Sequence, residues 1–198
     1  MKRAENLKEF MSHTINFLAY GYTKVLITRI PKKKLAKKNE IYSRVAKNYN
    51  AWATRSQRAY AKSKGYANFQ MLVYLDLILI FHTRGEIKPE IDLGNGFVCF
   101  EQNNRLELKL SDYLGVIFFR DERNKITVRL SKETLKDFKN EIRESFKNKN
   151  GRRYNYTLNR FKGLPIYHGI IQQKKDTLKW LRENHKKFNS SWSIPRFL

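Results

Sequence analysis

Acidic residues are scarce in this sequence, and the shortage is local. Glu40 is the only acid between residues 10 and 75, and residues 147–198 contain two acids against 13 lysines and arginines. Residues 65–146 are nearly neutral, with 12 basic and 13 acidic side chains, whereas residues 1–64 carry 16 basic and three acidic ones. A balanced segment between two cationic ones is typical of a folded body with two polyanion-binding surfaces. Nucleic acid, RNA or DNA, is therefore the first expected partner.

Cysteine and long apolar runs are also scarce. Cys99 is the only cysteine, which excludes an intramolecular disulfide and a zinc site built from several thiolates of one chain. The longest apolar run, residues 71–81, contains Asp76 and is too short to span a bilayer. These absences predict a cytoplasmic protein in a reducing environment that makes no contact with membranes.

Familiar catalytic motifs are missing as well. The sequence has no His-x-His pair, no Gly-x-x-x-x-Gly-Lys phosphate loop and no Gly-x-Ser-x-Gly nucleophile turn, and its four histidines are scattered. A tyrosine side chain that acts as a nucleophile is kept as an alternative. The sequence therefore favours a non-catalytic, accessory role without a cofactor.

Apolar periodicity predicts an α+β fold. We expect a small, mostly antiparallel sheet packed with amphipathic helices, in a single compact body with basic N- and C-terminal parts. Helices are expected near residues 7–21, after Ser131 and at roughly 173–188. Strands are expected at residues 22–30, 96–101 and 105–110, and in a hairpin over 113–130. Residues 69–81 fit either one central strand or two short strands broken near Asp76.

The predicted elements and the charge distribution divide the chain at residue 146. Residues 1–146 are expected to form the α+β core, which includes a basic helix over 40–64. Residues 147–198 are expected to form a basic, aromatic loop over 151–163 and a C-terminal helix, both packed on the core.

The helix predicted over residues 40–64 has a cationic face. Its apolar residues, Trp52 and Tyr60 among them, gather on one side, whereas five cations fall within an arc of roughly 80° at about 100° per residue. Cations about 5–6 Å apart along a helix can follow a phosphate backbone. An ordinary solvated face is the alternative, although such faces usually include acids. With the lysines that precede the helix, the predicted contacts are Lys32, Lys33, Lys34, Arg44, Lys47, Arg55, Arg58 and Lys62.

Residues 151–163 (GRRYNYTLNRFKG) interleave cations with aromatic rings. Such a mixture neutralises phosphates while unpaired bases stack on the rings, which favours RNA or single-stranded or structured nucleic acid over bare duplex. In the alternative interpretation, the rings belong to the core of a strand and only the arginines are exposed. The predicted contacts are Arg152, Arg153, Tyr154, Tyr156, Arg160 and Lys162.

Asp76, His82 and Arg84 are a third candidate group, because they share parity along the apolar run. On one strand they would project from the same face, and a carboxylate in apolar surroundings is either paired or has a raised pKa. The alternative, which we favour, places Asp76 in a hairpin turn and His82 at a strand end, both exposed to solvent.

A separated acid followed by a Glu-x-Lys strand is the fourth pattern. Glu90 and Asp92 follow Pro89, and Glu107 and Lys109 share one face of a predicted strand. The pattern resembles that of the PD-(D/E)XK nucleases over about 20 residues. The resemblance implies a Mg²⁺-dependent endonuclease acting on DNA, for example one of a mobile element, in which acids hold the metal and Lys109 orients the attacking water. Normal alternation of charges on an exposed strand face accounts for the same residues.

A third hypothesis is a structural subunit of a larger nucleoprotein assembly. Its basic arms would be ordered only in the complex, so residues 31–39 and 147–163 would be protease-sensitive without RNA. All three hypotheses share nucleic acid as the partner and differ in what happens to it.

Overall fold

The computed structural model describes residues 1–188 and 192–194, and it confirms the α+β fold class. Residue contacts divide the chain into two compact units, Met1–Leu106 and Glu107–Leu198. The boundary predicted at residue 146 falls inside the second unit, near the end of helix α5 (Lys132–Lys147). Each unit has a sheet and helices of its own.

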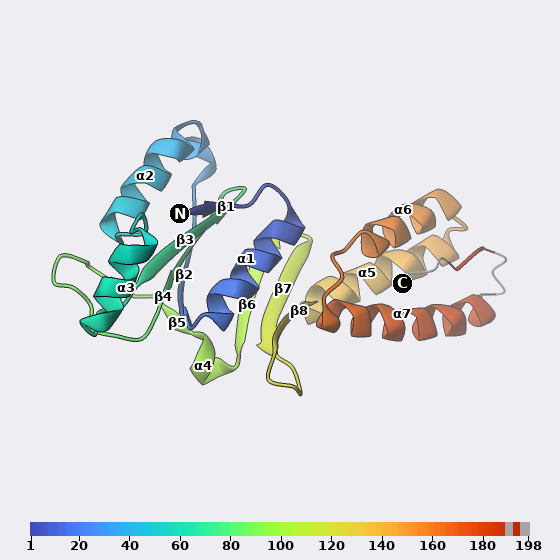
Figure 1. Cartoon of the computed structure of the whole chain (residues 1–198). Helices are drawn as coiled ribbons and strands as arrows, with labels where there is room; N and C mark the ends of the chain where they lie inside the picture. The colour runs from blue at the N-terminus through green and yellow to red at the C-terminus, as the bar shows by residue number, and fades with distance from the viewer. Residues whose placement is uncertain (189–191, 195–198) are drawn as a thin grey trace. The chain divides into compact units, whose positions relative to one another are not determined.

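The first unit is built on a five-stranded sheet in the order β1-β3-β4-β2-β5 (Figure 1). Its elements are β1 (Lys2–Arg3), α1 (Leu7–Ala19), β2 (Lys24–Arg29), the 3-10 helix η1 (Lys32–Lys37), α2 (Lys38–Asn48), α3 (Arg55–Ser63), β3 (Phe69–Tyr74), β4 (Leu77–His82), β5 (Val98–Cys99) and α4 (Phe100–Asn103). Neighbouring strands are antiparallel except β1 and β3, which pair in parallel. The N-terminal helix and the strand predicted at 22–30 are confirmed. Residues 96–101 form only a two-residue strand, and α4 follows it.

Helices cover both faces of this sheet (Figure 1). On one face, Phe10 of α1 stacks on Tyr74 with the ring centroids 5.0 Å apart. On the other face, α2 buries Tyr42 and Ala46 against side chains of β3 and β4. Strands covered on both sides have no solvent face, which explains why residues 69–81 are apolar at nearly every position.

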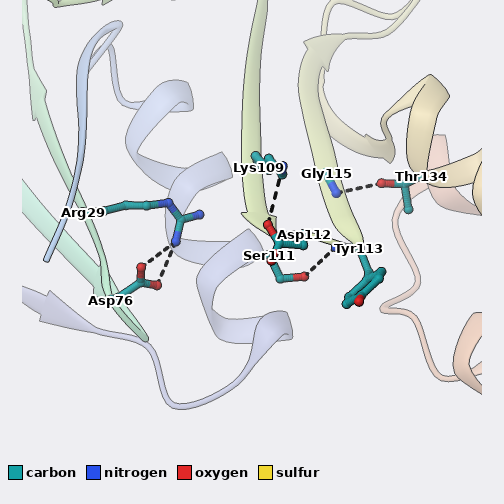
Figure 2. Close-up of polar contacts among 8 residues, drawn as sticks. All are labelled: Arg29, Asp76, Lys109, Ser111, Asp112, Tyr113, Gly115 and Thr134. Atoms are coloured by element: carbon teal, nitrogen blue, oxygen red, sulfur yellow. Dashed lines mark hydrogen bonds and ion pairs between the residues drawn. The ribbon is translucent and has the colours of Figure 1, made fainter. Parts of the chain in front are cut away.

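The apolar run at residues 69–81 is two strands joined by a tight turn, as the second of the two alternatives predicted. Leu75 and Asp76 form the turn between β3 and β4. Leu75 has a φ of 56°, which is uncommon for a residue with a side chain. Nη1 of Arg29 donates to both carboxylate oxygens of Asp76 at 2.8 Å (Figure 2), so β2 is tied to the turn.

The prediction of one basic helix over residues 40–64 is wrong. The segment forms α2 and α3, separated by residues 49–54. Just after α2, Asn50 adopts a φ of 49°. α3 then begins with a capping box, in which Thr54 Oγ1 accepts from the Gln57 amide and the Gln57 side chain accepts from the Thr54 amide. The cations predicted on one continuous arc therefore lie on two helices.

The second unit combines a three-stranded antiparallel sheet, in the order β6-β7-β8, with three helices. Its elements are β6 (Arg105–Ser111), which begins two residues before the division between the units, β7 (Leu114–Arg120), β8 (Ile126–Leu130), α5 (Lys132–Lys147), α6 (Gly151–Lys162) and α7 (His168–Lys187). The strands predicted at 105–110 and 113–130 are confirmed. Ser131 is the predicted N-cap of α5, since its Oγ accepts from the Thr134 amide at 3.2 Å.

The loop predicted over residues 151–163 is wrong, because residues 151–162 form helix α6. Asn150 Oδ1 caps the helix by accepting from the Arg153 amide at 2.9 Å. The side chains that α6 buries lie three or four positions apart, at Tyr154, Thr157, Leu158 and Phe161. This is the spacing of one helix face, and it fits neither a loop nor a strand. Phe161 stacks on Phe138 of α5 at 4.3 Å between centroids.

Helix α7 begins at His168 rather than near residue 173, and contacts with β8 fix its first turns. A Cβ at Gly169 would lie 2.6 Å from the Val128 carbonyl oxygen, so only glycine allows this close approach. The Gln173 side chain accepts from the Leu130 amide at 2.8 Å and donates to its carbonyl at 3.0 Å. The side chain thereby replaces a missing strand neighbour along β8.

Candidate nucleic-acid interface

Seven of the eight cations predicted to bind nucleic acid in the first unit are exposed. They are Lys32, Lys33 and Lys34 on η1, Arg44 and Lys47 on α2, and Arg55 and Lys62 on α3. Within the part of the chain that the structure describes, their side chains form no ion pair and no hydrogen bond. No acid therefore neutralises them, and their charge is available to an approaching anion.

Arg58, the eighth, is the exception. Its half-buried guanidinium donates to the Ala53 carbonyl and, with the Gln70 amide turned to face it, to the Gln70 oxygen at 3.0 and 3.2 Å. The Arg58 carbonyl accepts from Asn68 Nδ2 at 3.0 Å. Arg58 thus joins α3 to β3, and the prediction that it lies on the cationic face is corrected because its hydrogen bonds turn it inward.

Two aromatic side chains expected on the apolar side of this segment are instead exposed. Trp52, between α2 and α3, is 53% exposed, and Tyr60 on α3 is 67% exposed. Lys64 Nζ lies 5.9 Å from the centroid of the Tyr60 ring. The break between the two helices explains the difference, because it removes Trp52 and Tyr60 from the continuous apolar face. Sequence reasoning missed these rings as functional candidates.

In the second unit, one face of α6 presents cations around an exposed ring. Arg152, Arg153, Tyr156 and Arg160 are exposed, and Tyr156 remains 64% accessible. The Arg160 guanidinium lies 5.6 Å from the Tyr156 ring centroid, and its Nη1 lies 3.4 Å from Glu141 Oε2 of α5. Lys162 is exposed at the end of the helix. The helix thus keeps the mixture of cations and a ring that was predicted for a loop.

Tyr154 does not belong to that face, which corrects its prediction as a stacking residue. Its side chain is fully buried, and its hydroxyl lies 2.5 Å from His185 Nε2 of α7. Burial raises the pKa of Tyr154 to about 12, so the phenol is neutral at physiological pH. The alternative interpretation, which assigned this ring to the core, is correct for Tyr154 and Phe161, although the element is a helix rather than a strand.

Four cations that the sequence analysis did not single out follow one side of α7. They are Lys175, Lys179, Arg182 and Lys186, and all are exposed. Steps of four, three and four residues return to the same side of a helix, within an arc of roughly 60° over about 16 Å. Among the described residues none of the four forms an ion pair. The spacing was readable in the sequence, and we call this set the α7 stripe.

The group of Asp76, His82 and Arg84 does not form a site. Asp76 pairs with Arg29 in the hairpin turn, and Arg84 pairs with Glu101 at 2.5 Å. His82 ends β4 as expected but is buried rather than exposed. Its ring stacks on Phe69 with centroids 5.0 Å apart, and burial lowers its pKa.

The residues of the nuclease pattern fall in different units, Glu90 and Asp92 in the first and Glu107 and Lys109 in the second. Asp92, in the first unit, uses Oδ1 to accept from the Gly94 amide at 2.9 Å, which holds a turn. Glu107 and Lys109, in the second unit, share the exposed face of β6 as predicted. Lys109 Nζ lies 3.6 Å from Asp112 Oδ1 (Figure 2). Neither unit therefore contains the whole pattern.

Glu107 and Lys109 do line a cavity of about 280 Å³ in the second unit. Its other charged residues are Asp112, Glu133 and Asp137. Hydrogen bonds from the Gly115 amide to Thr134 Oγ1 at 2.8 Å and from the Tyr113 amide to Ser111 Oγ at 3.3 Å shape the surrounding strand ends (Figure 2). Among the described residues, no group of three or more His, Cys, Asp or Glu side chains is arranged to hold a metal ion.

No helix within residues 1–188 is long and apolar enough to cross a membrane. Comparisons with family models, with curated proteins and with solved structures yield no match. A proposal for the function must therefore come from the chain's own residues and their geometry.

Proposed function

We propose that this protein binds nucleic acid through its phosphate backbone, on RNA or on single-stranded or structured nucleic acid, in an accessory, non-catalytic role. The observation that carries the proposal is the α7 stripe, in which four exposed cations share one helix side without an acidic partner among the described residues. Successive phosphates of a strand present a line of negative charge that such a stripe can follow.

The formal net charge of +23 supports the same conclusion. Like charges repel one another in the compact state, and a polyanion that binds only the native state relieves the repulsion and stabilises the fold by mass action. Exposed Tyr156, Trp52 and Tyr60 lie among the cations and offer surfaces on which unpaired bases can stack. Single-stranded or looped regions are therefore favoured over bare duplex.

Salt dependence tests the proposal directly. We expect the logarithm of the association constant for a single-stranded RNA to fall linearly with the logarithm of salt concentration, by about 0.7 per phosphate contact. Fluorescence anisotropy with a labelled oligouridylate across a salt series measures this slope. Affinity that is absent, or that does not change with salt, contradicts the proposal.

A matched pair of variants ties the slope to the interface. Replacement of Arg55 and Lys62 by Gln should reduce the slope, by up to about 1.4 for a single strand. Replacement of Lys132 and Lys136 on α5 by Gln should change it less, because acids neighbour these two lysines on the same helix. Equal losses in the two variants would count against the cationic faces as the binding surface.

A metal-dependent nuclease is the second candidate function, and one observation favours it: Glu107 and Lys109 line a cavity with further carboxylates. A carboxylate cluster that held Mg²⁺ could activate water for attack on a phosphodiester. A cleavage assay with Mg²⁺ compares the wild type with Glu107→Gln. Cleavage that requires Mg²⁺ and disappears in the variant would replace the accessory role by the enzymatic one.

A further inference from the structure

The first unit contains a cavity of about 440 Å³ beside α3. It lies in the size range of small-ligand pockets and is lined by aromatic, amide and cationic side chains, including Tyr60, Tyr66, Asn50, Gln57, Asn68 and Lys88. We propose that this cavity holds one unpaired nucleobase of a bound strand. The inference rests on the proposed function and deepens it, since it assigns a base-binding site next to the phosphate-binding cations.

Aromatic rings provide the stacking surface. Tyr60 and Tyr66 both line the cavity, and Phe69, which is 3% exposed, forms part of its wall. The exposed ring of Tyr60 makes no contact with another aromatic residue of the described chain. An exposed aromatic ring at the edge of a cavity offers an unstacked base a surface to stack on, because every base has a π face.

Amide groups of the cavity are free to bind the edge of a base. Gln57 Oε1 is used by the helix cap, but its Nε2 makes no hydrogen bond within the described residues. Asn68 is 8% exposed and donates through Nδ2 to the Arg58 carbonyl, which leaves Oδ1 as an acceptor. The side-chain amide of Asn50 also has no hydrogen-bond partner among the described residues. Donors and acceptors that line one cavity match the mixed edges of nucleobases.

Charge around the cavity suits a base that carries a phosphate. None of the described residues that line the cavity is acidic. Lys88 Nζ lies 5.6 Å from the Tyr66 ring centroid and 3.8 Å from Glu90 Oε1, an ion pair long enough to yield to a phosphate. Lys64 lies over the Tyr60 ring. A base on the rings would therefore have its backbone near ammonium groups, whereas a duplex keeps its bases stacked inside and cannot enter.

The test uses the full chain and an oligouridylate that carries a single 2-aminopurine. We expect wild-type protein to change the 2-aminopurine fluorescence through stacking, and Tyr60→Leu to abolish that change while weakening single-strand binding roughly 5- to 150-fold. Tyr60→Phe keeps the ring and should restore both signals. Tyr113→Leu is the matched control, because Tyr113 is 74% exposed in the second unit and lies outside the cavity.

A second variant tests the amide contacts without disturbing the backbone. Asn50 has a φ of 49°, which glycine adopts readily, so Asn50→Gly should fold normally while it removes one amide. We expect the preference among adenine, cytosine and uracil at the probed position to change. An unchanged preference together with wild-type fluorescence in Tyr60→Leu would overturn the inference.

Separate arms distinguish failure of the cavity from failure of the proposed function. In Tyr60→Leu, the affinity for a duplex and the salt slope should be unaltered. If both are unaltered and the change in 2-aminopurine fluorescence also persists, the cavity inference alone fails. If the wild type binds no polymer, an NMR titration with AMP decides. Shifts in the ring resonances of Tyr60 and Tyr66 would support the base site. If neither resonance shifts, both the base site and the proposed interface are wrong.

Discussion

The two units carry nearly equal positive charge but arrange it differently. The first has 19 basic and eight acidic residues, and the second has 22 basic and ten acidic ones. In the first unit the cations are divided among η1, α2 and α3, beside exposed rings and a cavity. In the second they follow the long sides of α6 and α7. Under the proposed function, net charge would attract a polyanion to either unit, whereas the arrangement of the charge would select which part of the polyanion each unit contacts.

Each unit is compact by itself, and the largest expected effect tests whether the two units also unfold separately. Phe161 is 2% exposed and stacks on Phe138, so Phe161→Ala should destabilise the second unit by about 3–5 kcal/mol. Hydrogen exchange should accelerate in α5 and α6 while β3 and β4 keep their protection. Equal acceleration in both units would show that they unfold together and would remove the basis for treating them separately.

Neutralisation of the α7 stripe is the next largest effect. If Lys179 and Arg182 each contact a phosphate as proposed, Lys179→Gln with Arg182→Gln should lower duplex affinity roughly 60-fold at about 0.1 M salt. Single-strand affinity should fall as well, because a stripe of charge recognises backbone rather than bases. Anisotropy titrations with both ligands measure the effect, and a loss confined to the single strand would contradict the assignment.

The buried Tyr154 gives the second unit an alkaline limit. Its pKa is raised to about 12 in the folded chain, above the ordinary value of about 10, so the folded state holds the proton more tightly. The stability that the buried phenol contributes is fully present below about pH 10. The free energy of unfolding then falls on the order of 2 kcal/mol as pH rises toward 12. Denaturant unfolding measured across this pH range should show that the free energy of unfolding of Tyr154→Phe does not fall in this way. A parallel decline in both proteins would assign it to other groups.

Tyr156 should have a smaller effect that depends on the ligand. Tyr156→Leu removes an exposed ring from α6 while leaving Arg160 in place, so single-strand affinity should fall roughly fivefold and duplex affinity should stay unchanged. Competition titrations with the two ligands make the comparison. If both weaken alike, the ring supports the helix rather than a base.

His82 gives the first unit an acid-sensitive group, with the smallest expected effect. Burial, with a minor contribution from Lys24, lowers its pKa, so the unfolded chain binds more protons below about pH 6.5. The free energy of unfolding of the first unit should therefore fall as pH decreases through that value, and less so in His82→Phe. Hydrogen exchange in β3 and β4 reports the difference. His168→Gln, which replaces an exposed histidine of the second unit, should leave the pH dependence of hydrogen exchange in β3 and β4 unaltered.

Local periodicity predicted most elements, and the missed ones have physical explanations. β2, the β7–β8 hairpin and α5 follow from alternation, turn residues and a Ser131 cap. The capping box at Thr54 was a readable signal for the break between α2 and α3. β1 could not be predicted, because a two-residue strand in parallel pairing depends on the distant β3 for its hydrogen bonds.

The candidate interface was predictable in charge but not in orientation. Exposed positions such as Arg44 and Lys62 follow from composition, and the α7 stripe follows from spacing alone. The inward turn of Arg58 depends on Gln70, and the burial of Tyr154 depends on His185 in another helix. The cavity beside α3 is lined by residues from separate segments of the chain, so no local sequence pattern could predict it.

Strand β6 has a practical consequence for anyone who would study the two units as separate fragments. Leu106, Leu108 and Leu110 are buried along it, yet the division between the units passes between Leu106 and Glu107. A cut at that division would sever a seven-residue strand and leave a buried leucine without its neighbours. Fragment boundaries are better placed at Asn104, whose left-handed backbone already interrupts regular structure.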